Sequence, residues 1–377
     1  YFKYMIDLLR EKGASHIKVF GGGGGVIVPE EIAELHAYGV SHIFSPADGQ
    51  SMQLQGIIND MMERSDYDLA DEGLPENTDD LTGNEYMKLS RLITGLDENT
   101  LPKSYTDALT TQAEQWAKTP VLGITGTGGA GKSSLTDELI RRFSLELEQL
   151  KIAIIAIDPT KRKTGGALLG DRIRMNAINH PNIYFRSIAT RDTLGEVPQA
   201  LPDIINACKV AQFDLIIVET PGIGQGDAGI VPYVNVSMYV MTPEFGAASQ
   251  LEKIDMLDFA DLVVINKFDR KGSEDAFRDV RKQYQRNYEL FTTPIEELPI
   301  YGTMASKFND DGVTALYQGL LRTFKSKGLN TWDGSFFAPV EVKSSTTSSA
   351  IIAAERQRYL AEIAETVRDD HTQLQSR

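Results

Sequence analysis

The sequence predicts an α/β fold whose main part is a doubly wound, mostly parallel β-sheet. Three observations support this prediction. Apolar runs of strand length alternate with stretches of helical period from residue 120 to about residue 328. Most of these runs are apolar at successive positions, as expected of parallel strands that are buried on both faces. The segment is also about as long as one doubly wound domain, roughly 200 residues.

The main domain, residues 120–328, is expected to contain seven strands. They span residues 121–125, 151–158, 183–187, 215–219, 235–242, 262–266 and 299–303. A helix over 134–143 is expected to follow the first strand directly. Such a strand–helix alternation places consecutive strands in parallel, with helices on both faces of the sheet.

A shorter alternation precedes this domain, and residues 1–64 are expected to form a smaller piece of parallel sheet. Its expected elements are helices over 4–12, 29–38 and 50–63 and strands over 16–20 and 40–44. Five glycines, residues 21–25, follow the first strand and fit either a flexible loop or a ligand contact. Residues 65–119 are expected to form an acidic linker with two helices, over 86–94 and 104–118, and residues 329–377 a connector.

The composition narrows the classes of partner. The formal net charge is −15, which argues against a general nucleic-acid or anionic-membrane surface. No apolar run reaches the length of a membrane span. The single cysteine, Cys208, reads as a small buried side chain and fits a cytoplasmic location. The five histidines show no metal-ligand spacing, and because the first residue is Tyr1, we expect the chain to begin inside a longer protein.

A phosphate-binding loop is predicted where the first strand of the main domain meets its helix. Residues 126–133 read GTGGAGKS and match the pattern GxxxxGK[ST] between a strand and a helix. Glycines let backbone N–H groups converge on a polyphosphate, and the helix N-terminus favours an anion. Lys132 is expected to contact the β- and γ-phosphates. The expected phosphate-side residues are Gly126, Gly128, Gly129, Ala130, Gly131, Lys132, Ser133 and Ser134.

A guanine-binding motif is predicted at the end of the strand over 262–266. The residues Asn266-Lys267-Phe268-Asp269 match the pattern NKxD. Guanine presents N1–H and an exocyclic amino group side by side, and the carboxylate of Asp269 can accept from both. The Lys267 stem can cover the base, and Asn266 can tie this loop to the phosphate loop. At the end of a later strand, the N–H of Ala305 is a candidate donor to guanine O6.

Magnesium ligands and catalytic groups are expected at the ends of two further strands. Glu219 and Thr220 end one strand, and Asp158 ends another. With the Ser133 hydroxyl, these residues and Asp171 are the expected metal ligands. Either Asp158 or Gln225 is expected to orient the attacking water, with Lys132 as the third catalytic residue. Arg174 is expected to lie near the phosphates, although Asp171 and Arg174 also fit a surface ion pair.

These motifs together resemble the GTPase chaperones of adenosylcobalamin-dependent mutases. The resemblance rests on residues 126–133, the sequence Asp158-Pro159-Thr160, the glycine-rich stretch 164–171, residues 219–225 and residues 266–269. It covers about 200 residues, a length typical of one such domain. It implies a P-loop GTPase domain that uses Mg²⁺ and takes GTP as its substrate.

The N-terminal segment extends the resemblance. Gly24 and Gly25, with Phe44, Ser45 and Pro46, resemble the second half of a Rossmann-like cobalamin-binding domain, in which they would contact the nucleotide tail of the cofactor. The family's cobalt-ligating motif, DxHxxG, is not found in this sequence and is expected upstream of Tyr1.

The order of cobalamin segment, linker and GTPase is similar to that of fused isobutyryl-CoA mutases, where a mutase barrel follows. The resemblance implies that GTP hydrolysis gates adenosylcobalamin delivery to the fused mutase domain and protects it from inactivation. The full protein would interconvert isobutyryl-CoA and butyryl-CoA, with an acyl-CoA substrate, and would be a homodimer. Three alternatives stay open: a stand-alone metal-insertion GTPase, a cobalamin carrier with a structural nucleotide site, and an ATP-using kinase, which the motif at Asn266 disfavours.

Overall fold

The chain divides into two compact units, Tyr1–Glu76 and Asn77–Arg377. The structure is a computed structural model, and of the 377 residues it describes 1–22, 27–67, 81, 86–159, 175–190, 197–222, 228–246, 248–329, 332 and 335–346. In the described part of the chain, no helix has the length and apolar character that crossing a membrane requires.

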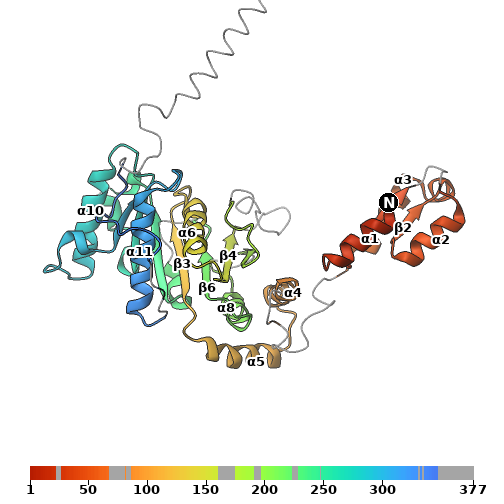
Figure 1. Cartoon of the computed structure of the whole chain (residues 1–377), viewed down its shortest axis with the longest axis horizontal. Helices are drawn as coiled ribbons and strands as arrows, with labels where there is room; N and C mark the ends of the chain where they lie inside the picture. The colour runs from red at the N-terminus through yellow and green to blue at the C-terminus, as the bar shows by residue number, and fades with distance from the viewer. Residues whose placement is uncertain are drawn as a thin grey trace, which may run out of the picture. The chain divides into compact units, whose positions relative to one another are not determined.

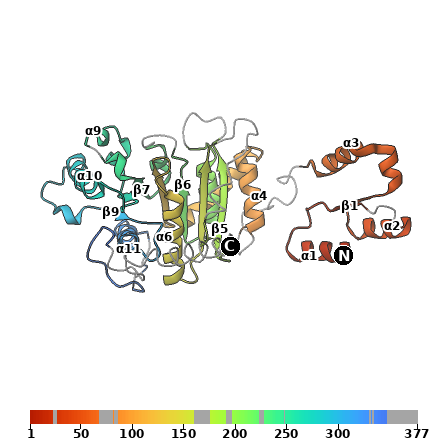
Figure 2. The same cartoon turned by 90° about the horizontal axis from the view of Figure 1, so that it is seen from above.

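Unit 1 is a small α/β element with two parallel strands. In chain order it contains α1 (Phe2–Glu11), β1 (Phe20–Gly22), α2 (Pro29–Tyr38), β2 (His42–Phe44) and α3 (Pro46–Ser65). The strands pair in parallel, with Gly21 opposite Ile43. Ile6, Val19, Val40 and Ile43 form its buried apolar cluster. Unit 1 is drawn in red and orange-red in Figure 2, where its three helices are labelled.

Unit 2 is built on a seven-stranded sheet in which every pairing is parallel. The strands are β3 (Val121–Gly126), β4 (Ile152–Asp158), β5 (Ile183–Ala189), β6 (Leu215–Glu219), β7 (Val236–Met241), β8 (Leu262–Asn266) and β9 (Ile300–Thr303). Their order across the sheet is β5-β4-β6-β3-β7-β8-β9, with β3 central. The chain proceeds from β3 toward one edge and later, through β7, toward the other, which makes the sheet doubly wound.

Helices cover both faces of this sheet (Figure 1). Within the described residues, the α-helices of unit 2 are α4 (Tyr86–Asp97), α5 (Lys103–Ala113), α6 (Lys132–Glu146), α8 (Leu201–Val210), α9 (Ala248–Leu251), α10 (Ser273–Asn287) and α11 (Asp311–Ser326). On one face, α6 and α11 enclose a core with Leu122, Ile124 and Val240. On the other face, α4 and α8 pack on residues such as Ile216, and α9 and α10 on residues such as Val263. Strand residues therefore alternate between two apolar layers, which is why most strand positions are apolar.

The seven predicted strands are confirmed, and two of them, β6 and β8, have the predicted bounds. Three predictions for other elements need correction. The strand predicted over 16–20 begins only at Phe20 and continues into the glycine run. Helix α3 begins at Pro46 instead of residue 50, because the Ser45 hydroxyl accepts the Asp48 N–H and caps the helix. The helix predicted over 104–118 ends at Ala113 and continues as a 3₁₀ turn, Glu114–Trp116.

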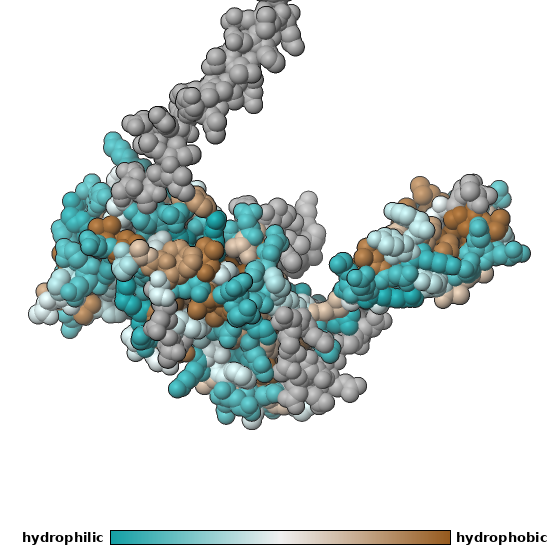
Figure 3. Space-filling view, viewed as in Figure 1, coloured by the Kyte–Doolittle hydropathy of each residue, from teal (hydrophilic) through white to brown (hydrophobic). Residues whose placement is uncertain are grey.

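Helices α4 and α5 are part of the unit 2 fold. Leu89, Leu92 and Leu109 are almost wholly buried and share a cluster with Ile204 of α8. Hydrophilic side chains cover much of the face of unit 2 that Figure 3 shows, and the apolar side chains visible there form smaller patches between them. The apolar residues of the sheet are buried, and their removal from solvent is the main stabilising contribution to the fold.

Candidate nucleotide-binding site

The carboxyl ends of three adjacent strands, β4, β6 and β3, meet at one edge of the sheet. In doubly wound folds, ligands bind outside this edge. A cavity of about 530 Å³ opens there. Its lining consists of Gly129, Gly131, Lys132, Ser133, Ser134, Ala156, Ile157, Asp158, Pro159, Glu219, Thr220, Pro221 and Lys267. Residues predicted separately from four sequence motifs therefore line one cavity.

The phosphate loop connects β3 directly to α6, which begins at Lys132. The Lys132 side chain is buried, with 7% of its surface exposed. Its ammonium group donates to the carbonyl oxygens of Gly126 at 3.1 Å and Thr127 at 3.3 Å. A cation is thereby held inside a loop of backbone N–H groups at a helix N-terminus, an arrangement that attracts a polyphosphate.

Oxygen groups of α6, β4 and β6 lie together where the sequence predicts a metal ion. The Ser133 hydroxyl donates to Glu219 Oε1 at 2.6 Å. Asp158 and Glu219 are both buried and line the same cavity. A hydroxyl and two carboxylates are hard oxygen donors of the kind that Mg²⁺ prefers, with water and phosphate oxygens completing the shell. These residues therefore fit the predicted magnesium ion.

Two threonines near this site have their hydroxyl groups in hydrogen bonds within the protein. The Thr220 hydroxyl donates to Thr125 Oγ1 at 2.9 Å, so it supports the end of β6. Thr136 Oγ1 lies 3.0 Å from Glu219 Oε2 and fixes the second oxygen of that carboxylate. Sequence reasoning missed Thr136. The available signal was its spacing, because residues three apart, such as Ser133 and Thr136, lie on the same side of a helix.

The guanine motif contacts the phosphate loop directly. The side-chain amide of Asn266 donates to the Ala130 carbonyl oxygen at 2.8 Å. Lys267, which has a left-handed φ of 58°, donates from Nζ to the Gly129 carbonyl oxygen at 2.6 Å. The close approach requires glycine at position 131, because a Cβ atom there would lie 2.6 Å from Asn266 Nδ2. The φ of Gly131, 87°, also favours glycine.

Asp269 and Ala305 are the two remaining residues for which the sequence predicts a contact with the base. Asp269 follows β8 in an exposed position, where its carboxylate is accessible to a ligand. Ala305 follows β9, and its N–H donates to Asn266 Oδ1 at 3.2 Å. Thr303 donates to the same oxygen at 3.1 Å. The structure thus uses the Ala305 N–H to fix Asn266, where the sequence suggested a contact with guanine O6.

Replacement of Asn266 by alanine is expected to destabilise the protein. Asn266 is 2% exposed, and its loss leaves the Ala130 carbonyl and the Ala305 N–H without their partner. Unsatisfied buried groups of this kind cost about 1–3 kcal/mol each, so the free energy of unfolding should fall by at least about 2 kcal/mol. Urea titration measures this value. Asn179→Ala, a change at an exposed position, is the control, and an equal effect of both changes would contradict the role of Asn266.

Several predicted site residues lie outside the described residues. They are Asp171, Arg174, Gln225, Gly24 and Gly25. In unit 1, Phe44 ends β2 and is buried. Ser45 donates to Asp48 Oδ2 at 2.7 Å and accepts from the Asp48 N–H, so its hydroxyl is used as a helix cap. These two side chains therefore offer packing surface instead of free polar groups for a cobalamin.

A metal site made wholly of protein side chains differs from the magnesium site predicted at the nucleotide. Among the residues that the structure describes, no group of three or more His, Cys, Asp or Glu side chains could hold a metal ion. The magnesium site predicted at Ser133 would need no such group, because a nucleotide's phosphates and water supply most of the ligands of Mg²⁺ in sites of this type.

The sequence matches one protein family and several curated proteins. Residues 89–330 match the model of a family described as methylmalonyl-CoA mutase-associated GTPase MeaB. A fused isobutyryl-CoA mutase of Cupriavidus metallidurans is 61% identical over 99% of this chain and 34% of its own length. One of Geobacillus kaustophilus is 54% identical over 98% of this chain and 34% of its own length. The chain spans about a third of the length of these curated relatives.

A crystal structure of an LAO/AO transport system kinase also resembles the chain. It has a TM-score of 0.48 and 24% sequence identity, and the match covers 67% of this chain and 75% of that one.

Proposed function

The chain belongs to the family of methylmalonyl-CoA mutase-associated GTPases, and from this premise we propose that unit 2 binds GTP with Mg²⁺ and hydrolyses it at the cavity beside β3. The observation that carries the proposal is the pair of contacts between the two loops. Asn266 reaches the Ala130 carbonyl, and Lys267 reaches the Gly129 carbonyl. Since the phosphate loop and the NKxD loop touch, one nucleotide can occupy both.

Each group at the site has a role in this proposal. The phosphate loop binds the triphosphate through its N–H groups, and Lys132 stabilises the charge that develops on the transferred phosphoryl group. Ser133, Asp158 and Glu219 would hold Mg²⁺, which would supply positive charge to neutralise the phosphates. Asp269 accepts the two guanine N–H groups. Asp158 or Gln225 orients the attacking water.

Hydrolysis is expected to require Mg²⁺ and to prefer GTP over ATP. Phosphate release measured with each nucleotide, with Mg²⁺ or with excess EDTA, tests the proposal. GTP turnover should be abolished by EDTA and restored by added Mg²⁺. The rate with ATP should be lower by about a hundredfold or more, because adenine lacks the donors that Asp269 accepts. Binding of GTP without turnover would favour a structural nucleotide site, and equal rates with ATP would contradict guanine recognition.

For the whole protein, we propose that this GTPase gates adenosylcobalamin loading of a mutase carried on the same polypeptide. Relatives with 61% and 54% identity are fused isobutyryl-CoA mutases, which supports this proposal. The full protein would then interconvert isobutyryl-CoA and butyryl-CoA as a cytoplasmic homodimer, and buried Cys208 is compatible with that location. A non-hydrolysable GTP analogue should slow cofactor loading of the full-length protein. Loading at the same rate with GTP and with the analogue would contradict gating.

A further inference from the structure

A short segment beyond α11 returns to the sheet and lies along its outer strand, β9. We define residues 343–346 as the strap. The N–H of Gly302 donates to the Lys343 carbonyl oxygen at 2.8 Å, and the N–H of Ser345 donates to the Gly302 carbonyl oxygen at 3.0 Å. Gly302 and Ser344 form a parallel bridge. The strap therefore pairs with the edge strand whose end carries the base-side residues Met304 and Ala305.

Two adjacent aspartates at the start of α11 bind the strap. Asp310 Oδ2 accepts from the Ser345 hydroxyl at 2.8 Å. Asp311 accepts from the Thr346 N–H at 2.9 Å and also from the Thr346 hydroxyl. The fit is close, because a Cβ atom at Gly312 would lie 2.1 Å from the Gly302 oxygen and 2.4 Å from Ser345 Oγ. A side chain at position 312 would displace the strap.

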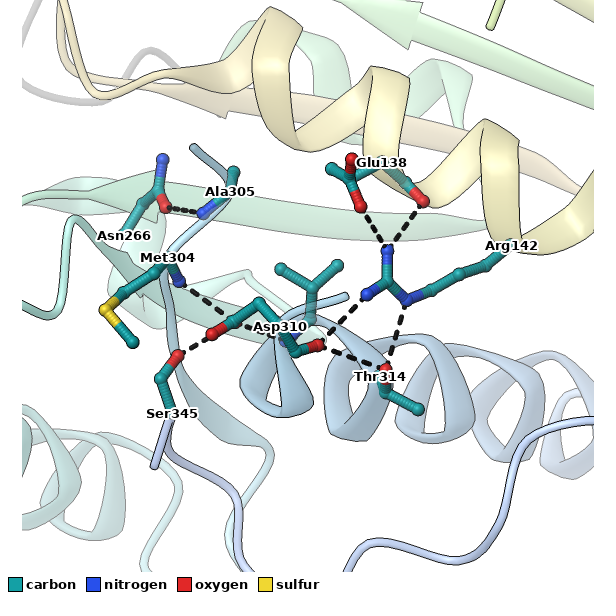
Figure 4. A network of polar contacts seen from close by, with 9 residues as sticks. Glu138, Arg142, Asn266, Met304, Ala305, Asp310, Thr314 and Ser345 are labelled. Atoms are coloured by element: carbon teal, nitrogen blue, oxygen red, sulfur yellow. Dashed lines mark hydrogen bonds and ion pairs between the residues drawn. The ribbon is translucent and has the colours of Figure 1, made fainter. Parts of the chain in front are cut away.

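Asp310 also holds the loop that carries Ala305 (Figure 4). It is 4% exposed, and its Oδ2 accepts the Met304 N–H at 3.0 Å and the Val313 N–H at 2.9 Å. Its backbone oxygen accepts from Arg142 of α6 at 3.0 Å. One buried carboxylate thus joins the strap, the helix cap and the base-side loop.

A continuous set of hydrogen bonds leads from the strap to the phosphate loop. Ser345 bonds to Asp310, and Asp310 accepts the Met304 N–H. The next residue, Ala305, donates to Asn266, which in turn donates to the phosphate loop. The four hydrogen bonds of this path are 2.8–3.2 Å long, and the peptide bond between Met304 and Ala305 joins the second to the third. A displacement of the strap would therefore change the position of the residues beside the base.

We propose that Asp310 and Ser345 are positioning residues for guanine recognition, so that the strap sets the affinity of the site for guanine nucleotides. The inference rests on the proposed GTPase function. Because binding couplings are reciprocal, a bound guanine nucleotide must also stabilise the strap against opening. The strap thereby connects occupancy of the base site to the chain that continues beyond residue 346.

Ser345→Ala tests the first half of the proposal. The change removes one hydrogen bond to a carboxylate. The loss of such a bond corresponds to a change of up to about tenfold in the dissociation constant for a guanine nucleotide. GDP dissociation, followed with a fluorescent analogue, should become about 3–10-fold faster. The KM for GTP should rise while kcat stays within about twofold, because Lys132 and Ser133, which face the phosphates in this proposal, are retained and make no direct contact with Ser345. Asp310→Asn should act in the same direction and more strongly, since Met304 also depends on this carboxylate.

Ser326→Ala is the matched control for this substitution. Ser326 lies exposed at the end of α11, and its hydroxyl bonds within its own helix. A role of Ser345 in stability alone would lower Tm and leave GDP dissociation as in the control, and that result overturns the proposal. If wild-type protein shows no preference for GDP over ADP, the proposed function itself fails. If it shows the preference and Ser345→Ala is silent, only the role of the strap fails.

Amide hydrogen exchange tests the reciprocal half. The N–H groups of Ser345 and Thr346 are bonded to Gly302 and Asp311, so their exchange requires the strap to open. Saturating GDP with Mg²⁺ should slow their exchange by about 3–10-fold, the same factor as the expected effect of Ser345→Ala, whereas ADP should not. Equal exchange rates with and without GDP would overturn the proposal.

Discussion

Replacement of Lys132 by alanine is expected to reduce GTP hydrolysis by at least about a hundredfold, the effect typical of losing one group that stabilises transition-state charge. The ammonium group lies within the phosphate loop, bonded to the carbonyl oxygens of Gly126 and Thr127. Alanine leaves the loop and α6 in place but removes that charge. Phosphate release at saturating GTP measures the loss, and thermal unfolding checks the fold.

Lys118→Ala is the matched control for Lys132→Ala. Lys118 is exposed and lies just before β3, on the side of the amino ends of the strands, away from the phosphate loop. We expect wild-type turnover from this variant. Retention of GTP hydrolysis by Lys132→Ala within about tenfold of wild type would be inconsistent with transition-state stabilisation by Lys132.

The second large effect is expected from Asp269→Asn, which should change the preferred base from guanine to xanthine. Asparagine presents one acceptor and one donor, whereas guanine presents two donors, so a guanine N–H group and the amide would face each other unpaired. Xanthine has an oxygen in place of the exocyclic amino group and matches the amide. The kcat/KM for GTP should fall by about a hundredfold or more, with a gain for xanthosine triphosphate.

Competition between nucleotides makes this test quantitative. Asp107→Asn, at an exposed position on α5, is the control and should keep the preference for GTP. An Asp269→Asn protein that still prefers GTP over xanthosine triphosphate would show that this carboxylate does not contact the base.

The sheet could be predicted from sequence because its strands are apolar at successive positions. β8 (Leu262–Asn266) is the clearest case, since every residue is buried and the polar residues that follow mark its end. β1 could not be bounded in this way, because Phe20–Gly22 contains two glycines and too few apolar residues to show a period. The end of α5 was likewise missed, because a 3₁₀ turn continues the helical pattern beyond Ala113.

The site could be predicted in part, for a topological reason. Carboxyl ends of parallel strands share one edge, so motifs that follow β3, β4 and β6 are brought together without any knowledge of contacts. The bond from Thr136 to Glu219 and the bond from Ser345 to Asp310 depend on tertiary packing. The sequence predicts only a connector here, because the Ser/Thr-rich composition carries no sign that Asp310 and Asp311 accept hydrogen bonds from Ser345 and Thr346.

The account depends most on a single nucleotide bridging the two loops. A crystal structure of the protein with GDP and Mg²⁺ tests this directly. We predict that the β-phosphate lies within hydrogen-bond distance of Lys132 Nζ and that the same molecule's guanine donates to the carboxylate of Asp269. A GDP molecule whose phosphates occupy the loop while its base lies away from Asp269 would contradict the account.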